Sequence, residues 1–244
     1  MHLVRLPSLL LSALVLSACT HDEPKSDSAL ARATPPPVAS AERTDTALVH
    51  TLPPAVDSVP TEPLNWVPAE SRIPAGFDSA VTTTAAGSGL TCHVHARYVV
   101  VSRDNTKDDV GSDVIVRGHT PGTAGNCTGD SLSGDFVLRN QEADYFLGLR
   151  GDRLFIDVGT GAISDLVVYD LRARRKLEVI SGYEIEGWRD NTTLELWVMA
   201  GETTRKQCPK VPEGMGVGID SLHTLDLTTM KLTPTGRWRC AARE

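Results

Sequence analysis

The sequence lacks the short motifs that usually carry enzymatic chemistry. It has no Gly-x-Ser-x-Gly nucleophile turn, no phosphate-binding glycine loop and no His-Glu-x-x-His zinc motif. It has no Cys-x-x-Cys pair, which argues against a zinc ribbon. The net charge is −7 and no basic patch is present, so we expect no nucleic-acid partner. These absences favour a non-catalytic protein, and they predict no cofactor.

Long apolar runs are also missing. The longest one, Leu9–Leu16, follows the basic Arg5 and is too short to span a bilayer as a permanent helix. It ends in Leu16-Ser17-Ala18-Cys19, which resembles the lipobox of bacterial lipoproteins. The resemblance implies a signal peptide over residues 1–18, lipidation of Cys19 and membrane attachment through the lipid. Thr20 is not the aspartate of inner-membrane retention, so the same resemblance implies the outer membrane of the cell envelope.

Residues 19–70 are rich in Pro, Ala, Ser and Thr and show no apolar periodicity. Pro35-Pro36-Pro37 and Pro53-Pro54 stand out in this segment. Such a composition cannot bury enough surface to offset the entropy of ordering. We therefore predict a disordered tether with a span on the order of 40 Å, followed by one domain over residues 71–244. Trp66 and Phe77 are expected where the chain joins the core.

Residues 71–244 contain short strand patterns separated by turn residues. No stretch of them shows the apolar periodicity of a helix over three turns. This predicts an all-β domain, an antiparallel meander that forms a sandwich, an irregular barrel or a small propeller-like domain. The expected strands are Cys92–Ser102, Val114–His119, Asp135–Asn140, Tyr145–Leu149, Arg153–Val158, Asp165–Leu171, Lys176–Tyr183, Thr193–Met199, His223–Leu227 and Lys231–Cys240.

An internal echo supports the meander. Residues 169–183 align with residues 225–238 with one gap. Each copy has Asp-Leu at a strand end, a short turn, a Lys-Leu restart and a glycine before an aromatic residue. This rhythm is typical of propeller blades, although a complete propeller needs at least four blades of about forty residues.

Four cysteines remain after Cys19, and an even number in an exported protein predicts two disulfides. They allow three pairings. We favour Cys92–Cys127 and Cys208–Cys240, because each bond then closes a local loop. In the chain-entropy model each bond stabilises the fold by roughly 3–4 kcal/mol.

Three histidines offer a possible metal site. If Cys92–Ser102 is one strand, His93 and His95 share a face with Arg97, opposite the apolar Val94 face. Pairing residue 102 with residue 114 would then bring His119 diagonal to His95, and three imidazoles could bind zinc or copper. The positive charge of Arg97 would repel a metal ion. We therefore favour a strand that is anchored by the Cys92 disulfide and carries the histidines on its polar face.

Two acidic stretches have weaker chemical interpretations. Asp157 precedes Val158-Gly159, which resembles the aspartic-protease pattern but lacks its hydroxyl residue and a second copy. Residues 104–113 are acidic but lack the ligand alternation of a calcium loop. We predict a strand-end aspartate and a polar hairpin loop instead.

The segments "DYFLGLRGDRLFIDVGTG", "YDL", "QCP" and "RWRC" together resemble an uncharacterised group of exported bacterial β-proteins, over about residues 145–240. The resemblance implies no activity. We expect a lipid-anchored binding or structural module for an envelope protein or glycan, with loops 120–134 and 202–218 as contact surfaces. Strand addition at an exposed sheet edge is one mode of binding that we consider. The alternatives are an inhibitor of host lysozyme or protease, and a metal-binding or metal-dependent protein that uses His93, His95 and His119.

Overall fold

The computed structural model describes residues 62–64, 76–87, 89–105, 110–161 and 163–243. The predicted signal peptide, Cys19, Trp66 and most of the predicted tether lie outside these ranges. The described residues form strands and turns, with no helix. None of their segments is therefore a helix that could cross a membrane.

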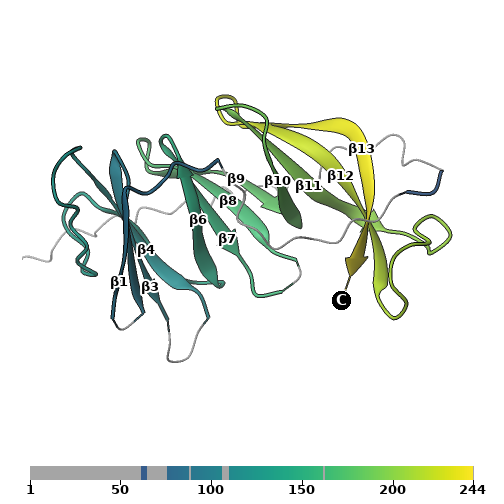
Figure 1. The fold of residues 1–244 in the computed structure, drawn as a ribbon, viewed down its shortest axis with the longest axis horizontal. Helices are drawn as coiled ribbons and strands as arrows, with labels where there is room; N and C mark the ends of the chain where they lie inside the picture. Colours follow the sequence, from purple (N-terminus) through teal and green to yellow (C-terminus); the bar gives the residue numbers. More distant parts are fainter. Residues whose placement is uncertain (1–61, 65–75, 88, 106–109, 162, 244) are drawn as a thin grey trace, which may run out of the picture. The chain divides into compact units, whose positions relative to one another are not determined.

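The first sheet is a five-stranded antiparallel meander whose strands follow one another in chain order (Figure 1). Its strands are β1 (Thr82–Ala86), β2 (Leu90–Val94), β3 (Tyr98–Asp104), β4 (Ser112–Gly118) and β5 (Phe136–Leu138). The edge strand β5 has only three residues and pairs with the middle of β4. The first sheet therefore narrows sharply at this edge.

Two four-stranded meanders follow. The second sheet contains β6 (Asp144–Arg150), β7 (Arg153–Val158), β8 (Asp165–Asp170) and β9 (Arg175–Ser181). The third contains β10 (Tyr183–Trp188), β11 (Thr193–Glu202), β12 (Gly216–Asp226) and β13 (Lys231–Arg243). The predicted all-β meander is confirmed, and its described strands form three open sheets rather than a closed barrel.

The second sheet packs against an apolar cluster on each of its two faces. In β7, Leu154 and Ile156 join the apolar cluster shared with the first sheet, whereas Phe155 joins the cluster shared with the third. Side chains alternate between faces along a strand, and all three residues are almost fully buried. This explains why β7 reads as a continuous apolar run rather than an alternating one.

The chain passes from the second sheet to the third through Gly182 alone. Gly182 has a φ of +61°, and it lies between the end of β9 and the start of β10. Its N–H donates to the Ser164 carbonyl, and its own carbonyl accepts from the Met199 N–H. A Cβ at this position would lie 2.8 Å from the Met199 Cβ, so glycine fits a tight corner where the strand changes sheets.

The internal echo corresponds to two hairpin turns of the same construction. Asp170 ends β8 and accepts hydrogen bonds from the N–H groups of the second and third residues after it; Asp226 does the same at the end of β12. Arg174 and Met230 then both adopt a φ of 55°. The second and third sheets thus repeat one strand–turn–strand design, which the sequence pattern had indicated.

The predicted single strand Cys92–Ser102 is wrong. The chain reverses at His95–Arg97, and the His95 N–H donates to the Tyr98 carbonyl at 2.8 Å. Cys92 therefore pairs with Val101 and shares the outer face of the sheet with it, whereas Val100 faces the second sheet. The predicted alignment of the next pair is confirmed, because Ser102 lies opposite Val114.

Both predicted disulfides are present, Cys92–Cys127 and Cys208–Cys240. The second anchors a cluster with Val211, against which Leu64 packs. The Leu64 N–H donates to the Gln207 carbonyl at 3.0 Å. Ordered contacts thus occur at a residue inside the range predicted as tether.

Phe77 is a second point where the chain before the sheets meets the core. Its ring packs edge-on against Phe155 and Trp188, at 5.2 and 5.5 Å between centroids. A Cβ at position 148 would lie 2.5 Å from the Phe77 ring, so Gly148 admits the aromatic ring against β6. Phe77 therefore joins the core as predicted.

Candidate functional site

A groove of about 550 Å³ opens where the short strand β5 leaves part of the second sheet uncovered. β8 and β9 have six and seven residues, so they extend past the three-residue β5 that lies over them. The volume falls within the range of about 300–1,000 Å³ that is typical of ligand sites. The groove is therefore a consequence of unequal strand lengths in two packed sheets.

The floor of the groove is apolar. Val158, Val167 and Val179 line it from three successive strands, and their register places them on one face of the second sheet. Leu138 contributes from β5. Val158, Val179 and Leu138 are only partly buried, in contrast to the closed core beside them. The exposed parts of these side chains could be covered by a bound partner.

The rim of the groove carries more negative than positive charge. Its acidic side chains are Glu142, Asp144, Asp165 and Glu178, and its basic ones are Arg139 and Lys176. Arg139 is already paired with Asp113, with 2.6 Å between the guanidinium and carboxylate atoms. The rim therefore favours a cationic partner.

The surroundings of Asp144, one of the rim carboxylates, shift its pKa upward. Burial raises its pKa, and the Glu142 carboxylate nearby acts in the same direction. The Gln141 N–H donates to Asp144 at 3.1 Å and opposes this shift, as does the charge of Lys176. A bound cation would favour the ionised form of Asp144 and would relieve the repulsion from Glu142.

Tyr169 closes the floor of the groove beside β5. Burial, reinforced by Asp144, raises the pKa of Tyr169 to about 12, so the phenol is neutral at physiological pH. Its ring packs edge-on against Phe136 at 5.7 Å, and the Lys176 ammonium lies 6.0 Å from the ring centroid. The groove thus combines an aromatic wall, aliphatic side chains and carboxylates. These groups suit binding rather than nucleophilic chemistry.

The three histidines do not converge on one point. The His93 ring lies 5.2 Å from the Phe146 ring and 6.4 Å from the His95 ring, measured between centroids. Both ring nitrogens of His119 lie within hydrogen-bonding distance of carbonyl oxygens, those of His95 at 2.7 Å and Thr123 at 3.2 Å. Within the described ranges no three His, Cys, Asp or Glu side chains are grouped to hold a metal ion.

The predicted polar histidine face does not include an exposed His95, because this residue is buried and only 6% exposed. Burial lowers its pKa, and the main chain and charge of Asp78, together with the main chain of Ser79, oppose this only in part. Burial also lowers the pKa of His93, and His95 nearby adds to the effect. Both imidazoles are therefore held as neutral groups at the contact between the first and second sheets.

Asp157, the residue considered for protease chemistry, accepts a hydrogen bond from the Tyr183 hydroxyl at 2.8 Å. This bond links the end of β7 to the start of β10. In the acidic stretch 104–113, whose residues 106–109 lie outside the described ranges, Asp104 accepts from the Ser112 hydroxyl and Asp113 from Arg139. The described aspartates of this stretch thus have partners within the hairpin or beside the end of β5.

Loop 120–134 covers the outer face of the first sheet and is fixed there by Arg117. The guanidinium donates to the carbonyls of Asn126 and Asp130, and it pairs with Asp135 at 3.0 Å. Both side chains of the ion pair are almost completely buried. Together with Cys127, these contacts make the loop a cover of the hydrophobic cluster beneath it.

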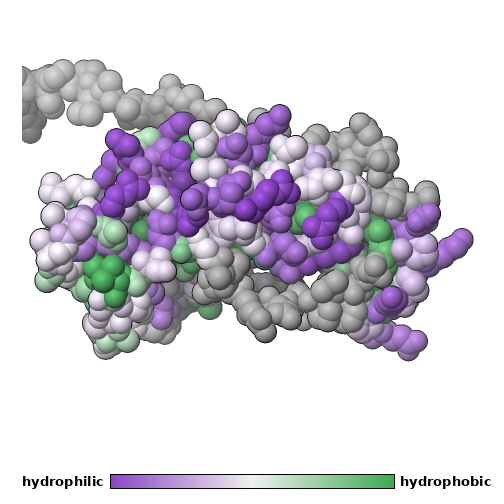
Figure 2. All heavy atoms as spheres, turned by 45° about the horizontal axis from the view of Figure 1, so that its top comes forward, coloured by the Kyte–Doolittle hydropathy of each residue, from purple (hydrophilic) through white to green (hydrophobic). Residues whose placement is uncertain are grey.

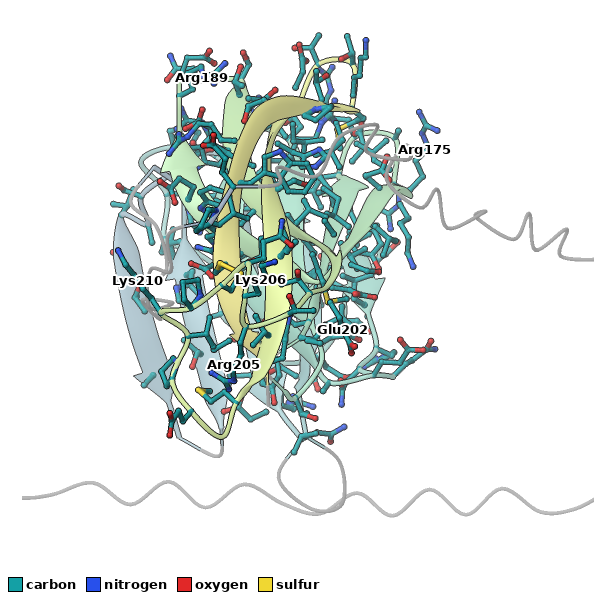
Figure 3. The ribbon with its side chains drawn as sticks, turned by 90° about the vertical axis from the view of Figure 1, so that its right-hand side faces the viewer. Arg175, Arg189, Glu202, Arg205, Lys206 and Lys210 are labelled. Carbon is teal, nitrogen blue, oxygen red and sulfur yellow. A yellow bond between two sulfur atoms is a disulfide. The ribbon has the colours of Figure 1, made fainter. Side chains whose placement is uncertain are left out.

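Loop 202–218 is organised in the same way, with one arginine and one disulfide. Arg205 donates to the carbonyls of Val211, Pro212 and Met215, within the loop that Cys208 attaches to β13. Figure 3 labels Arg205 and Lys206, which follow the last residue of β11 in the sequence. Both loops predicted as contact surfaces therefore have structural anchors.

Sequence reasoning missed a buried Ser221–His223 pair, whose hydroxyl and Nε2 are 2.7 Å apart. It also did not predict the groove, because the groove exists only where the short strand β5 ends. Ser221 and His223 lie opposite Val198 and Leu196, which belong to the core between the second and third sheets. Both are at most 3% exposed, so a substrate could not reach the hydroxyl. The Nδ1 atom of His223 has no hydrogen-bond partner within the described ranges, whereas a catalytic triad needs a carboxylate there.

A charged network on the opposite face of the third sheet was also missed. Arg239 donates to Glu184 and Asp220, and its guanidinium carbon lies 4.7 Å from the centroid of the Trp197 ring. The Trp197 indole N–H donates to Glu186 at 2.7 Å. The charged side chains of this face are thus paired with one another.

Figure 2 shows the mixed character of the surface more generally, with hydrophilic side chains predominating and apolar ones in smaller patches.

No family model, no curated protein and no solved structure matches this chain. The groove therefore has to be interpreted from its own chemistry.

Proposed function

We propose that this protein is a lipid-anchored, non-catalytic binding module of the bacterial cell envelope, and that the groove beside β5 receives its partner. The observation that carries the proposal is the partly exposed apolar floor of the groove under an acidic rim. Concave sites with an apolar lining and a few polar groups are the usual form of binding sites. Two packed sheets enclose the groove, and the Cys92–Cys127 bond braces the first of them, so the site has a rigid support.

The attachment part of the proposal rests on the lipobox resemblance at Cys19. More than one acyl chain is needed for stable anchoring, because each buried CH₂ contributes only about 0.8 kcal/mol. A proline-rich segment between Cys19 and the domain would allow the groove to reach partners away from the lipid surface. Envelope proteins and glycans are the partners within that reach.

The experiment is photo-crosslinking in living cells that express the full chain. Benzoyl-phenylalanine replaces Gln141, which lines the groove, or Thr229, which is exposed in the β12–β13 turn. We expect a discrete adduct at Gln141 and none at Thr229, and mass spectrometry of the adduct distinguishes protein from glycan. Equal labelling at both positions, or no adduct at Gln141, would refute the groove as the binding site.

A further inference from the structure

The edge strand β5 leaves a place for one more strand. β5 pairs with β4 along one side, and its other side has no strand partner in the described part of the chain. An unpaired edge presents main-chain N–H and C=O groups to an incoming strand. The next position in the first sheet would lie over the floor of the groove, because Val137 and Leu138 of β5 form one of its walls.

Direct hydrogen bonds join the second sheet to the chain just before β5. Arg174, in the turn between β8 and β9, donates to the carbonyls of Gly134 and Asp135. These bonds tie the second sheet to the residues directly before β5. An added strand would therefore run from this arginine along Phe136–Leu138, a length of only a few residues.

The side-chain environment of that position is amphipathic. Neighbouring strands are about 4.8 Å apart, and successive side chains of an added strand would point to opposite faces. One set would point to Val158, Val167 and Val179 on the second sheet. Residues at the ends of the strand would meet the carboxylates of Asp144, Asp165 and Glu178 at the rim.

We propose that an extended, basic segment of another protein adds as a strand to the free edge of β5 and fills the groove. Main-chain hydrogen bonds to β5 would hold the segment, its apolar side chains would cover the floor, and its Lys or Arg residues would pair with the rim. This inference rests on the proposed binding function and specifies the partner. A glycan is a different outcome, because it has no peptide N–H groups to form a strand.

Charge argues against two other occupants. Between Cys19 and residue 62 the chain carries Asp22, Glu23, Asp27, Glu42, Asp45 and Asp57 against Lys25, Arg32 and Arg43. A second copy of the chain brings a net charge of −7. Both would meet an acidic rim with charge of the same sign, so a separate basic segment is the better complement.

The test measures binding of defined peptides to the purified full chain by fluorescence anisotropy. The probe is a labelled alternating Lys-Val peptide, and the matched peptide has Glu in place of Lys. Two further peptides carry N-methyl groups either on every Val or on every Lys, because these two sets of N–H groups point to opposite edges of a strand. We expect the Lys-Val peptide to bind, the Glu-Val peptide not to bind, and one of the two methylated peptides to lose binding.

Variants of the chain then locate the interaction. Asp165→Asn with Glu178→Gln should weaken binding of the Lys-Val peptide about three- to tenfold at low salt, as expected for two partly exposed ion pairs. The control variant, Glu202→Gln with Glu213→Gln, makes the same charge change at exposed positions of the third sheet and the loop after it. It should leave the affinity unchanged.

Binding that survives both methylation patterns, or that responds equally to both double variants, would overturn the strand-addition model. So would the absence of binding by the Lys-Val peptide. A Gln141 adduct in cells combined with any of these results would retain the groove as a binding site and would reject only the basic strand as its occupant. Loss of the adduct would instead reject the proposed function itself.

Discussion

Arg117→Ala should destabilise the domain far more than the removal of an exposed arginine. The Arg117 and Asp135 side chains are 6% and 4% exposed, with 3.0 Å between guanidinium and carboxylate. In the variant, Asp135 keeps the hydrogen bond from the Leu132 N–H but loses its charged partner. Breaking a buried ion pair costs roughly 3–5 kcal/mol, because the remaining charge is left uncompensated.

The matched control is Arg189→Ala. Its guanidinium lies closer to a carboxylate, at 2.5 Å from Glu195, but the arginine side chain is 55% exposed. Exposed pairs contribute only about 0–1 kcal/mol, so burial rather than distance should decide the ranking. The comparison therefore tests whether Arg117 anchors loop 120–134 as a buried cover of the first sheet or whether its ion pair contributes no more than an exposed one.

The assay is urea denaturation at neutral pH under oxidising conditions, followed by circular dichroism. Domains of this kind are typically stable by about 5–15 kcal/mol, so the Arg117 variant should still fold and its midpoint should shift clearly. A third variant, Arg117→Met with Asp135→Leu, should recover much of the loss because no buried charge remains. If Arg117→Ala costs no more than Arg189→Ala, loop 120–134 is not anchored as described.

Three further predictions concern the disulfides, acid stability and the membrane anchor. Replacing Cys208 and Cys240 together by Ala should lower the free energy of unfolding by roughly 3–4 kcal/mol, since the bond closes a 32-residue separation; an unchanged urea midpoint would contradict this. The pKa values of His93 and His95 lie below 6.5 in the folded state, so the unfolded chain binds more protons and stability should fall as pH drops through about 6. Urea midpoints at pH 7 and pH 5 should therefore differ less in a His93→Gln, His95→Gln variant than in the parent, and equal differences would refute the argument. Cys19→Ala should leave the chain uncleaved or release it from the membrane fraction, because no acyl anchor can form; unchanged fractionation with unchanged mass would remove the lipoprotein proposal.

Local chemistry explains which parts of the fold could be predicted. The turn after Asp170 repeats after Asp226 because a carboxylate that accepts two following N–H groups leaves a recognisable Asp-Leu pattern. Cysteine spacing and the preference for local loops were enough to select the disulfide pairing. These features depend on residues close together in the sequence, or on few alternatives.

The missed features depend on contacts that a single strand pattern does not contain. The turn at His95–Arg97 has no glycine, proline, asparagine or aspartate, and neither Ala96 nor Arg97 has a positive φ. The sequence therefore predicted one continuous strand, Cys92–Ser102, across this turn. The sequence repeat identified Gly182 only as the glycine before an aromatic residue. It did not predict that a separate strand, β10, begins after this glycine.

The groove could not be predicted from sequence for a related reason. Predicted strand Asp135–Asn140 is about twice as long as the observed β5, and a longer strand would have covered part of the second sheet. Val158, Val167 and Val179 have the apolar character of ordinary core residues. Only the packing of the two sheets shows that part of this surface is left open.

The most direct test of the groove as a binding surface is the yield of the Gln141 photo-adduct in cells that carry Val179→Lys. Val179 lies on the floor and is partly buried, so the substitution places a positive charge among apolar side chains while its alkyl stem can still pack. The melting temperature of the purified variant is measured in parallel to establish that the domain remains folded. We predict that the adduct falls at least about tenfold, since repulsion and lost apolar contact together approach 1.4 kcal/mol or more. An undiminished adduct in a folded variant would contradict binding at this groove.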